Sequence, residues 1–535
     1  MKKLVVLRES KQNVEKIIGP DWEESLLMFS RVIGFSLEID EEIKLEFNPD
    51  RPDLFSLYSL KESMENFAGN VRKRGTLKSS KRLLQNNKPA SREFAAAFEV
   101  DYQQSEIGAI LDSVNYLDRL SETVGKKRKQ FAFGVHDNNK ISGNITYDWI
   151  DTASDFETYD LKSGKLRDLL NEHPKGIEYK NILEVNMDTG KIWALNDEKG
   201  PISIPPFFNS GRTRVDQNTK NILVDITSTS LYGLIQGLRL SLGYFQKLGI
   251  DCKLLSSMDT EYAKNKLNEM EMEINKNAFI ELTGIKSDER DIMSNLTKMG
   301  YSGDIKKVKV PLERIDVMGM EDLIEDFVKA YGINNIKEKP LVSSFTGKFE
   351  DMNYFSSKLR NLMVSLGFQE VINFVLRGNG GDDSIKILNT KSDEYSILRK
   401  DMLYGFLDFY QRNKQYGFPQ KIFEIGDVFL RGNQYRSLGV STSGRHSNYS
   451  EIKGYLDRLL NAFTDIKPLI VAHKSEELID GRSGIIEVNG IEIGLIGEAN
   501  PELIGKYTFN FPVTYFQINL EKLYQILKPL VKDNT

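Results

Sequence analysis

The sequence contains very little cysteine and histidine. Its 535 residues include one cysteine, Cys252, and four histidines. A single cysteine excludes a disulfide bond within the chain and indicates a reducing compartment. The histidines are spread over positions 136, 173, 446 and 473, and there is no Cys-x-x-Cys pair, so we expect no zinc site of the usual composition.

Two further absences narrow the class of protein. Neither the Gly-x-x-x-x-Gly-Lys phosphate loop nor the Gly-x-Gly-x-x-Gly dinucleotide motif occurs, which excludes the commonest nucleotide-binding motifs. No stretch approaches the roughly 20 consecutive apolar residues of a membrane span. The apolar run at residues 4–7 is too short for a signal peptide. We therefore expect a cytoplasmic protein without a membrane segment.

The charge of the chain is nearly balanced. There are 72 basic and 77 acidic residues, which give a net charge of -5. The chain as a whole is therefore not attracted to nucleic acid, and any contact with RNA must come from local patches. With 40% hydrophobic and 28% charged residues, the composition is that of an ordinary globular protein with enough apolar material for large cores.

The chain is long enough for about three or four domains, and its mixture of predicted helices and strands indicates a multidomain α+β protein. We expect four domains: a mixed α/β domain over residues 1–75, a large domain over 76–268, a small helix-turn-helix-like domain over 269–345, and an antiparallel sheet with flanking helices over 346–535. Residues 71–89 are rich in lysine and arginine, and we interpret them as a charged surface strand and loop in preference to a solvated linker.

Hydrophobic periodicity predicts the main elements of these domains. Apolar residues at three- and four-residue steps predict helices over residues 21–33, 115–124, 231–247 and 351–366. A further helix, capped by Asp53 or Ser56, is predicted through Leu60, Met64 and Phe67 and stops at Gly69. Alternating or continuous apolar runs predict strands over residues 98–101, 109–112, 131–137, 222–229 and 369–375.

The most distinctive segment runs over residues 314–336. It predicts a helix that follows a tight turn at Gly319 and stops at Gly332. Three acids of this helix are spaced at i, i+3 and i+4 and share one flank, and a fourth precedes the turn: Asp322, Glu325, Asp326 and Asp316. Four carboxylates around one point suit a hard cation such as Mg2+. The helix dipole also favours acids at this end without a metal, so spacing leaves both interpretations open.

A second group of polar residues is predicted between residues 202 and 229. A loop stiffened by two prolines carries Asn209, Ser210 and Thr213. In the strand that follows, alternation puts Asp225 and Thr227 on one face. These five residues are candidates for a polar pocket. No serine is paired in sequence with an activating histidine, so the pattern by itself does not indicate a hydrolase.

Short motifs occur in order along nearly the whole chain. They are Asn-Pro-Asp-Arg-Pro-Asp-Leu at 48–54, Gly-Val-His-Asp at 134–137, Pro-Pro-Phe-Phe-Asn-Ser at 205–210, the acidic segments 316–317 and 322–326, Tyr-Gly at 331–332, Leu-Arg at 398–399, Phe-Glu-Ile-Gly-Asp-Val at 423–428, and Gly-Glu at 497–498 with Pro501. In this order they resemble the beta subunit of phenylalanyl-tRNA synthetase in its archaeal and eukaryotic form.

This resemblance implies a subunit of an alpha2-beta2 heterotetramer that joins phenylalanine to tRNA(Phe) with ATP, through an aminoacyl-adenylate. It places the synthetic site in the alpha subunit. It implies that residues 346–535 form a class II synthetase-like module without catalytic residues, and the sequence indeed lacks the Gly-x-Gly-x-x-x-Arg of the third class II motif. The four acids at 316, 322, 325 and 326 are then expected to hold Mg2+ shared with the alpha subunit.

The resemblance also implies proofreading by residues 76–268. Tyrosine differs from phenylalanine by one hydroxyl, which an apolar pocket rejects only about 100-fold. A second site that hydrogen-bonds the hydroxyl can select tyrosine, because phenylalanine would leave its polar groups unpaired. We expect this editing site among Asn209, Ser210, Thr213, Asp225 and Thr227, where a positioned water hydrolyses the ester of Tyr-tRNA(Phe) without a covalent enzyme intermediate.

Two other functions remain open from the sequence. A non-enzymatic scaffold that binds RNA or DNA would need a basic helix in the small domain, whereas the predicted helix is acidic, and we expect no DNA partner. A free-standing aminoacyl-tRNA deacylase would leave residues 346–535 without a role. A broad apolar patch on that module would favour the complex over the deacylase.

Overall fold

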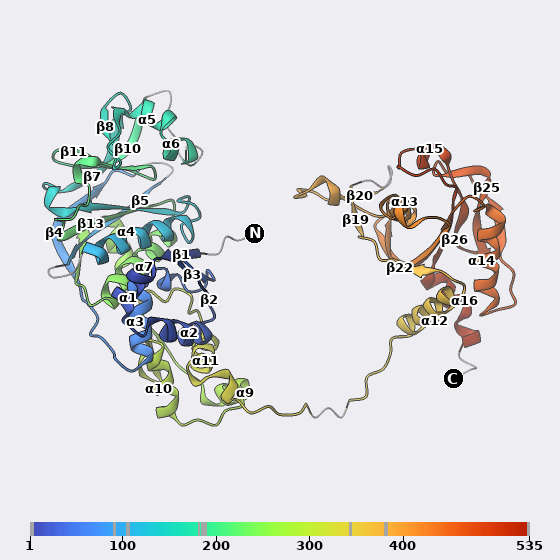
Figure 1. Ribbon diagram of the computed structural model, residues 1–535, viewed down its shortest axis with the longest axis horizontal. Helices are drawn as coiled ribbons and strands as arrows, with labels where there is room; N and C mark the ends of the chain where they lie inside the picture. Colours follow the sequence, from blue (N-terminus) through green and yellow to red (C-terminus); the bar gives the residue numbers. More distant parts are fainter. Residues whose placement is uncertain are drawn as a thin grey trace. The chain divides into compact units, whose positions relative to one another are not determined.

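A computed structural model describes residues 5–88, 92–102, 107–179, 182, 190–341, 345–378 and 384–531. The chain is divided into two compact units, residues 1–340 and 341–535, and each is described by itself (Figure 1). Both units combine helices with sheets, so the multidomain α+β class is confirmed. No helix in the described part of the chain has both the length and the apolar content that a membrane crossing requires.

The N-terminal part of the first unit is a small sheet covered by helices. Its strands lie in the order β1-β3-β2 and pair antiparallel. Ser56 caps the last helix by accepting a hydrogen bond from the backbone N–H of Ser59. The elements are β1 (Val5–Glu9), α1 (Lys11–Ile18), α2 (Trp22–Ile33), β2 (Ser36–Ile39), β3 (Ile43–Phe47) and α3 (Leu57–Phe67). They confirm the helix predicted over 21–33 and the helix through Phe67, which has Ser56 and not Asp53 as its cap.

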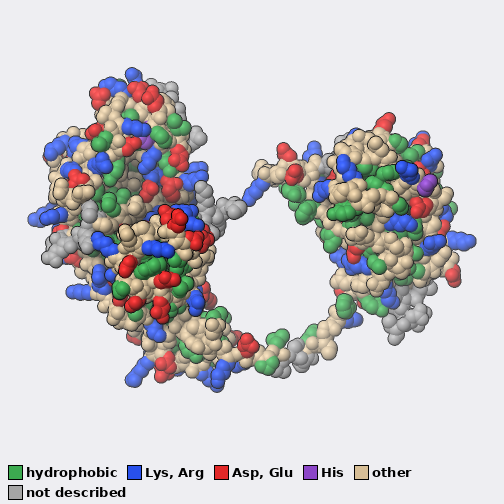
Figure 2. Space-filling view, in the orientation of Figure 1, with side chains coloured by type: hydrophobic (Ala, Val, Ile, Leu, Met, Phe, Trp, Pro, Cys, Tyr) green, Lys and Arg blue, Asp and Glu red, His purple; other side chains and the backbone are tan. Residues whose placement is uncertain are grey.

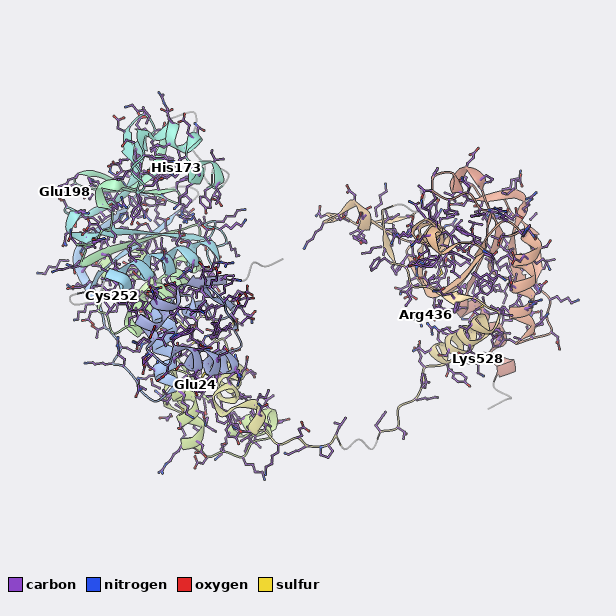
Figure 3. The ribbon with its side chains drawn as sticks, in the orientation of Figure 1. Glu24, His173, Glu198, Cys252, Arg436 and Lys528 are labelled. Atoms are coloured by element: carbon purple, nitrogen blue, oxygen red, sulfur yellow. The ribbon has the colours of Figure 1, made fainter. Side chains whose placement is uncertain are left out.

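A nine-stranded sheet forms the centre of the first unit. Its order is β12-β11-β10-β7-β4-β14-β5-β13-β6, and its pairs are antiparallel except β4 with β14 and β4 with β7. The strands are β4 (Leu77–Asn86), β5 (Phe94–Asp101), β6 (Phe131–Asp137), β7 (Ile145–Asp151), β10 (Lys191–Asp197), β11 (Gly200–Ile204), β12 (Phe208–Asn209), β13 (Asn221–Ser228) and β14 (Cys252–Ser256). Cys252, labelled in Figure 3, is buried in this sheet.

Helices pack one face of this sheet into a large core. Val224 and Ile226 of β13 contact the apolar side of α7 (Leu231–Lys247), whose bounds are as predicted. α4 (Ile107–Glu122) joins the same core through Leu117 and Leu120. The remaining elements of this part are β8 (Asp155–Glu157), β9 (Ser163–Lys165), α5 (Leu166–Glu172), α6 (Pro174–Tyr179) and α8 (Met258–Lys264).

One interpretation for this region is confirmed and one prediction is wrong. Residues 77–86 of the basic segment 71–89 form β4 of the sheet, and most of its side chains are charged or polar and alternate toward solvent, which confirms the charged surface strand and not the solvated linker. Pro89, at the end of that segment, lies outside the described residues. Residues 109–112, predicted as a strand, belong to α4, which begins well before the predicted residue 115.

The small domain combines a three-stranded sheet with three helices. Its elements are β15 (Met270–Met272), α9 (Lys276–Thr283), α10 (Glu289–Lys298), β16 (Ser302–Asp304), β17 (Lys307–Val310) and α11 (Met320–Tyr331), with the sheet order β15-β17-β16. Phe327 of α11 packs edge-on against Phe279 of α9 at 4.8 Å. Ile33 and Phe67 of the N-terminal part pack against the same core, and α11 and α10 lie beside α2 and α3 in Figure 1.

Buried ion pairs hold the parts of the first unit together. Asp53 accepts hydrogen bonds from Arg51 at 2.8 and 2.9 Å and from Lys247 of α7 at 3.3 Å. Arg74 pairs with Glu313, which lies just before α11. We call this set of four contacts the ionic seam. It explains the Asn-Pro-Asp-Arg-Pro-Asp-Leu motif, since Arg51 and Asp53 are both buried by it.

The second unit is built on a seven-stranded sheet in the order β18-β22-β23-β27-β26-β25-β24. All its pairs are antiparallel except β18 with β22, which confirms the predicted antiparallel sheet. Leu438 and Val440 of β23 face the core of α12, α14 and α16. The strands are β18 (Gln369–Glu370), β22 (Gln420–Leu430), β23 (Asn433–Ser443), β24 (Leu469–Ala472), β25 (Leu478–Val488), β26 (Ile491–Ala499) and β27 (Val513–Asn519).

Helices flank both faces of this sheet. α13 packs opposite α12, α14 and α16, and Gly439 of β23 allows it to approach closely: a Cβ there would lie 2.7 Å from the sulfur of Met402. Arg436, labelled in Figure 3, joins β23 to Asp427 of β22 and Asn353 of α12. The other elements are α12 (Asp351–Ser365), β19 (Leu376–Arg377), β20 (Ile385–Lys386), β21 (Ile397–Leu398), α13 (Leu403–Arg412), α14 (Tyr449–Asn461), α15 (Pro501–Ile504) and α16 (Leu520–Val531).

The strand predicted over residues 369–375 is wrong for most of its length. Only Gln369 and Glu370 form a strand. Ile372 and Phe374 are 92% and 72% exposed instead of buried. This apolar run therefore lies mainly at the surface of the unit and does not form a core strand.

Candidate functional site

The candidate site is built on the last two strands of the nine-stranded sheet. The edge strand β6 pairs antiparallel with β13, so that Gly134 lies opposite Asp225 and His136 opposite Leu223. Because side chains alternate along a strand, His136, Asp225 and Thr227 lie on one face of the sheet, away from the face that packs under α7. The sequence of these strands therefore places a polar face at the edge of the sheet.

Three buried side chains form a chain of hydrogen bonds on this face. The Nδ1 of His136 lies 2.8 Å from Oγ1 of Thr213, and its Nε2 lies 2.8 Å from Oδ2 of Asp225. All three residues are almost fully buried. Since an ionised carboxylate can only accept, His136 donates from Nε2 to Asp225. The contact fixes the orientation of the Asp225 carboxylate.

Asp225 and Asn209 line a cavity of about 220 Å³. This volume is several times the roughly 30 Å³ that one water molecule occupies in the liquid, so the cavity can take a compact side chain. A Cβ at Gly134 would lie 2.0 Å from Oδ2 of Asp225 and 2.9 Å from Oδ1 of Asn209, and the absence of a side chain there lets these two groups meet. The other lining residues are Val114, Asn115, Leu117, Asp118, Arg128, Ala132, Phe133, Val135, Tyr159, Lys175, Ser203, Ile204, Pro205, Pro206, Phe207 and Phe208.

The structure thus brings two of the five candidate pocket residues to the cavity. Ser210 instead caps a short helical turn by accepting from the N–H of Arg212 at 3.3 Å. The hydroxyl of Thr213 contacts Nδ1 of His136, on the side of the ring opposite to Asp225. Thr227 accepts a hydrogen bond from Nε of the buried Arg92 at 2.8 Å. These three residues support the polar face and do not line the cavity.

Arg128 brings a positive charge to the wall of the cavity. It follows two residues, Lys126 and Lys127, that share its left-handed backbone conformation, which is costly for residues other than glycine and occurs most often at functional sites. Burial lowers the pKa of the Arg128 guanidinium, but the Asp118 carboxylate and a hydrogen bond to Glu122 outweigh burial and hold the pKa above its usual value. Arg128 also donates to the carbonyl of Pro206 at 3.2 Å, so it braces the loop that carries Asn209.

His136 and Arg128 were not among the candidate residues from the sequence. Strand alternation contained a signal for His136, because it shares a face with Gly134 in a strand whose bounds were predicted correctly. Arg128 follows a helix end whose unusual backbone has no sequence signature, and its position could not be predicted. His173, labelled in Figure 3, pairs with Asp160 at 3.1 Å and is not part of the cavity lining.

The four acids predicted to bind Mg2+ do not converge. Asp316 and Asp326 both accept from Nη2 of Arg314, at 2.8 and 2.6 Å, and Asp316 also accepts from its Nε at 3.0 Å. Asp322 caps α11 by accepting from the N–H groups of Met318 and Gly319 at 2.7 and 2.9 Å. Glu325 is 64% exposed and pairs with Lys329 at 2.8 Å.

The carboxylates of Asp316, Asp326 and Asp322 thus already have partners within this chain. The four acids together therefore do not fit a Mg2+ ion held by this chain. Burial alone would raise the pKa of Asp326, but the charges of Arg314 and Arg51 and the hydroxyl of Tyr301 hold it below its usual value. Among the described residues, no group of three or more His, Cys, Asp or Glu side chains is placed to bind a metal. Asp322 lies at the N-terminus of α11, in agreement with the helix-dipole interpretation. Asp316, Asp326 and Glu325 instead form ion pairs with basic side chains of this chain.

Comparison with family models defines the class of the chain. Residues 272–333 match the model described as the tRNA synthetase B5 domain. Residues 336–520 match the model described as the phenylalanyl tRNA synthetase beta chain CLM domain. These matches cover the small domain and most of the second unit, and they place the chain among the aminoacyl-tRNA synthetases.

Curated relatives identify the family. The chain is 34% identical to the phenylalanine–tRNA ligase beta subunit of Thermoplasma volcanium, over 97% of this chain and 99% of that protein. It is also 34% identical to the beta subunit of Thermoplasma acidophilum and 27% identical to that of Archaeoglobus fulgidus, with 97% and 96% of this chain and 98% and 97% of those proteins covered. The chain belongs to the family of phenylalanine–tRNA ligase beta subunits.

A solved structure shows the same fold over part of the chain. An N-terminal fragment of the phenylalanyl-tRNA synthetase beta subunit from Pyrococcus horikoshii matches with a TM-score of 0.51 and 22% identity. The match covers 61% of this chain and 99% of that fragment.

Proposed function

We propose that the chain acts with an alpha subunit, as an alpha2-beta2 complex that charges tRNA(Phe) with phenylalanine using ATP, and that its cavity removes tyrosine from mischarged tRNA(Phe). The observation that carries the editing role is the Asp225 carboxylate, fixed by His136 and placed with Asn209 at the cavity wall. The synthetic step belongs to the alpha subunit. The four predicted Mg2+ ligands are not part of this proposal, because only Glu325 among them has a mainly exposed carboxylate.

Asp225 and Asn209 select tyrosine by its hydroxyl. A carboxylate in a buried wall accepts a hydrogen bond from the phenol, and the amide of Asn209 offers both a donor and an acceptor. The walls formed by Phe133, Phe207 and Phe208 contact the ring. A phenylalanine side chain offers no hydroxyl to the Asn209 amide or to the Asp225 oxygen that His136 does not contact, and an unpaired buried group costs roughly 1–3 kcal/mol.

Hydrolysis then needs a water at the ester carbonyl. The water oxygen forms the new bond to the carbonyl carbon, the bond from that carbon to the ribose oxygen breaks, and the proton of the water is transferred to the ribose oxygen, so tyrosine and the free tRNA end are released. Lys175 lines the same cavity and attracts the phosphates next to that end, whereas the charge of Arg128 is already paired with Asp118 and Glu122.

Exposed apolar side chains on the second unit support the proposal that this unit binds a partner subunit. Ile372, Phe374 and Tyr395 line one concavity, and Phe374 packs against Tyr395 at 5.9 Å. Leu388 and Tyr416 are also largely exposed, and Figure 2 shows apolar side chains gathered on the face of this unit in view. A surface of this kind favours a protein partner over a free-standing deacylase. The acidic α11 likewise argues against a DNA-binding scaffold.

Co-purification with the alpha subunit followed by two assays tests this proposal. We expect phenylalanine- and ATP-dependent charging of tRNA(Phe) only by the complex, and hydrolysis of Tyr-tRNA(Phe) but not Phe-tRNA(Phe). Charging by this chain alone would contradict the placement of synthesis in the partner. Full charging without hydrolysis of Tyr-tRNA(Phe) would contradict the editing role only.

The substitution Gly134→Ala should strongly impair editing. Its Cβ would push against Asp225 and Asn209, and a displacement of about 1 Å at a reacting site can cost about 100-fold in rate. We expect a fall of that size in Tyr-tRNA(Phe) hydrolysis with unchanged charging. Gly454→Ala is the matched control, since a Cβ there meets nothing within 4 Å. Equal hydrolysis by both variants would show that the cavity is not the site.

A further inference from the structure

A second pocket, on the sheet unit 341–535, combines aromatic rings with cations. It is an open concavity of about 730 Å³, within the usual range for ligand pockets. Its walls come from three loops: residues 414–421 before and at the start of β22, residues 444–451 after β23, and residues 508–511 before β27. No step of the proposed editing or charging reaction uses this pocket.

The aromatic part of the pocket is a cluster of three phenylalanines. The rings of Phe418 and Phe511 are 4.4 Å apart, and Phe509 stacks on Phe418 at 6.2 Å and 21°. Phe509 is buried and anchors the cluster, while Phe418 and Phe511 are half-buried at the pocket wall. Rings held in this way offer a surface on which a flat base can stack.

The charged part of the pocket is mainly basic. Lys414, Lys421, Arg445 and His446 line it against a single carboxylate, Glu451. Arg445 and His446 are exposed at the centre of a turn that is closed by the hydrogen bond from the N–H of Ser447 to the carbonyl of Gly444. Lys421 already pairs with Glu451 and Tyr455. Arg445 and Lys414 form no ion pair with the described carboxylates, and Lys414 donates to the hydroxyl of Thr508 at 3.1 Å.

We infer that this pocket binds one unpaired nucleotide of an RNA strand, with the base on Phe418 and Phe511 and the phosphate at Arg445 and Lys414. Aromatic rings beside cations recognise single-stranded nucleic acid, whereas a duplex hides its bases from such a pocket. The net charge of the chain is -5, so contact with RNA depends on local basic sites of this kind. The inference rests on the proposed tRNA partner and adds a contact outside the editing cavity.

Binding of a tRNA(Phe) transcript to the complex with the alpha subunit tests the inference. We expect Arg445→Glu and Phe511→Ala each to weaken binding about tenfold. Arg445→Glu should also lower the slope of log Kd against log salt by about one, because one phosphate contact is lost. Lys522→Glu is the control, since it reverses the charge of an exposed lysine of α16 in the same unit.

The outcomes separate this inference from the proposed function. If the wild-type complex binds the transcript and both pocket variants match Lys522→Glu in Kd and salt slope, the pocket does not bind RNA. If Arg445→Glu, an exposed substitution that leaves the core intact, instead prevents assembly with the alpha subunit, the pocket is a protein interface and the inference is overturned. If free AMP binds the pocket as tightly as the transcript, the ligand is a free nucleotide and not RNA. A wild-type complex that binds no tRNA would refute the proposed function itself.

Discussion

Asp225→Asn is expected to lower the hydrolysis of Tyr-tRNA(Phe) about 10- to 100-fold, because a hydrogen bond to a charged group contributes roughly 1.5–3 kcal/mol. Asparagine keeps the shape of the side chain and an oxygen that accepts from Nε2 of His136, which lies 2.8 Å from Oδ2 in the native chain. The substitution replaces the other carboxylate oxygen of Asp225, an acceptor, with an amide NH2 group, which is a donor. Charging with phenylalanine by the complex should not change, since the proposed function places that step in the partner.

The measurement is single-turnover deacylation of Tyr-tRNA(Phe) and Phe-tRNA(Phe) by the intact complex. If Asp225 recognises the phenol, the ratio of the two rates falls and the slow rate for Phe-tRNA(Phe) stays the same. An equal fall in the deacylation rates of both esters would instead indicate that Asp225 acts on the attacking water. Asp216→Asn is the control, because its carboxylate is 45% exposed, pairs with Lys140 and does not line the cavity.

Arg314→Met is expected to destabilise the small domain by about 3–5 kcal/mol, the usual cost when one partner of a buried ion pair is removed. Asp326 is only 3% exposed, and the substitution leaves it with the hydroxyl of Tyr301 as its remaining close partner, at 2.6 Å. The free energy of local unfolding can be measured from hydrogen exchange of the α11 amides in the full chain.

The adjacent acid of the same helix provides the matched control. Glu325 pairs with Lys329 at the surface, and an exposed pair at this spacing is worth about 0.3–0.5 kcal/mol. Glu325→Gln should therefore leave the exchange of α11 nearly unchanged. A large effect of Glu325→Gln, with a small one for Arg314→Met, would revive the prediction that these acids hold a shared ion.

The ion pair of Arg314 with Asp326 should make the stability of the small domain depend on pH, and the lowered pKa of Asp326 gives the direction. The pKa of Asp326 is held below the value of 3.8 that an unpaired aspartate has. A carboxylate with a lowered pKa in the folded state stabilises the fold fully above its unfolded pKa, and loses that contribution as the pH falls through the folded pKa. Protection of α11 should thus decline below about pH 4 in the native chain, and this decline should be weaker in Arg314→Met.

Sequence patterns predicted those elements whose own residues determine them. α7 was predicted residue for residue because its apolar stripe, its cap and its neighbouring strand all agree. β4 was predicted only as a charged surface strand without bounds, because most of its residues are charged or polar and its place in the sheet depends on pairing with β14 and β7. Pairing between distant segments leaves no local signal when one face of the strand is solvated.

The candidate sites show the same division. Alternation correctly placed Asp225 on the polar face of β13, and the loop prediction placed Asn209 beside it. Spacing along α11 could not show that Arg314 takes two of its neighbouring acids, because the competing partner comes from outside the helix. Likewise, Ile372 and Phe374 have the apolar character of a core strand but are exposed, and composition does not distinguish a core face from an exposed apolar face.

The ionic seam limits how this protein could have been assembled from separate modules in evolution. Asp53 comes from the N-terminal part, Lys247 from α7, and Glu313 from the segment before α11. A homologous small domain could replace this one by recombination only if it also carried an acid for Arg74, and a new N-terminal part would need an acid for Lys247. The parts of residues 1–340 could therefore be exchanged only together with their partners in the seam, whereas the sheet unit 341–535 has its own cores.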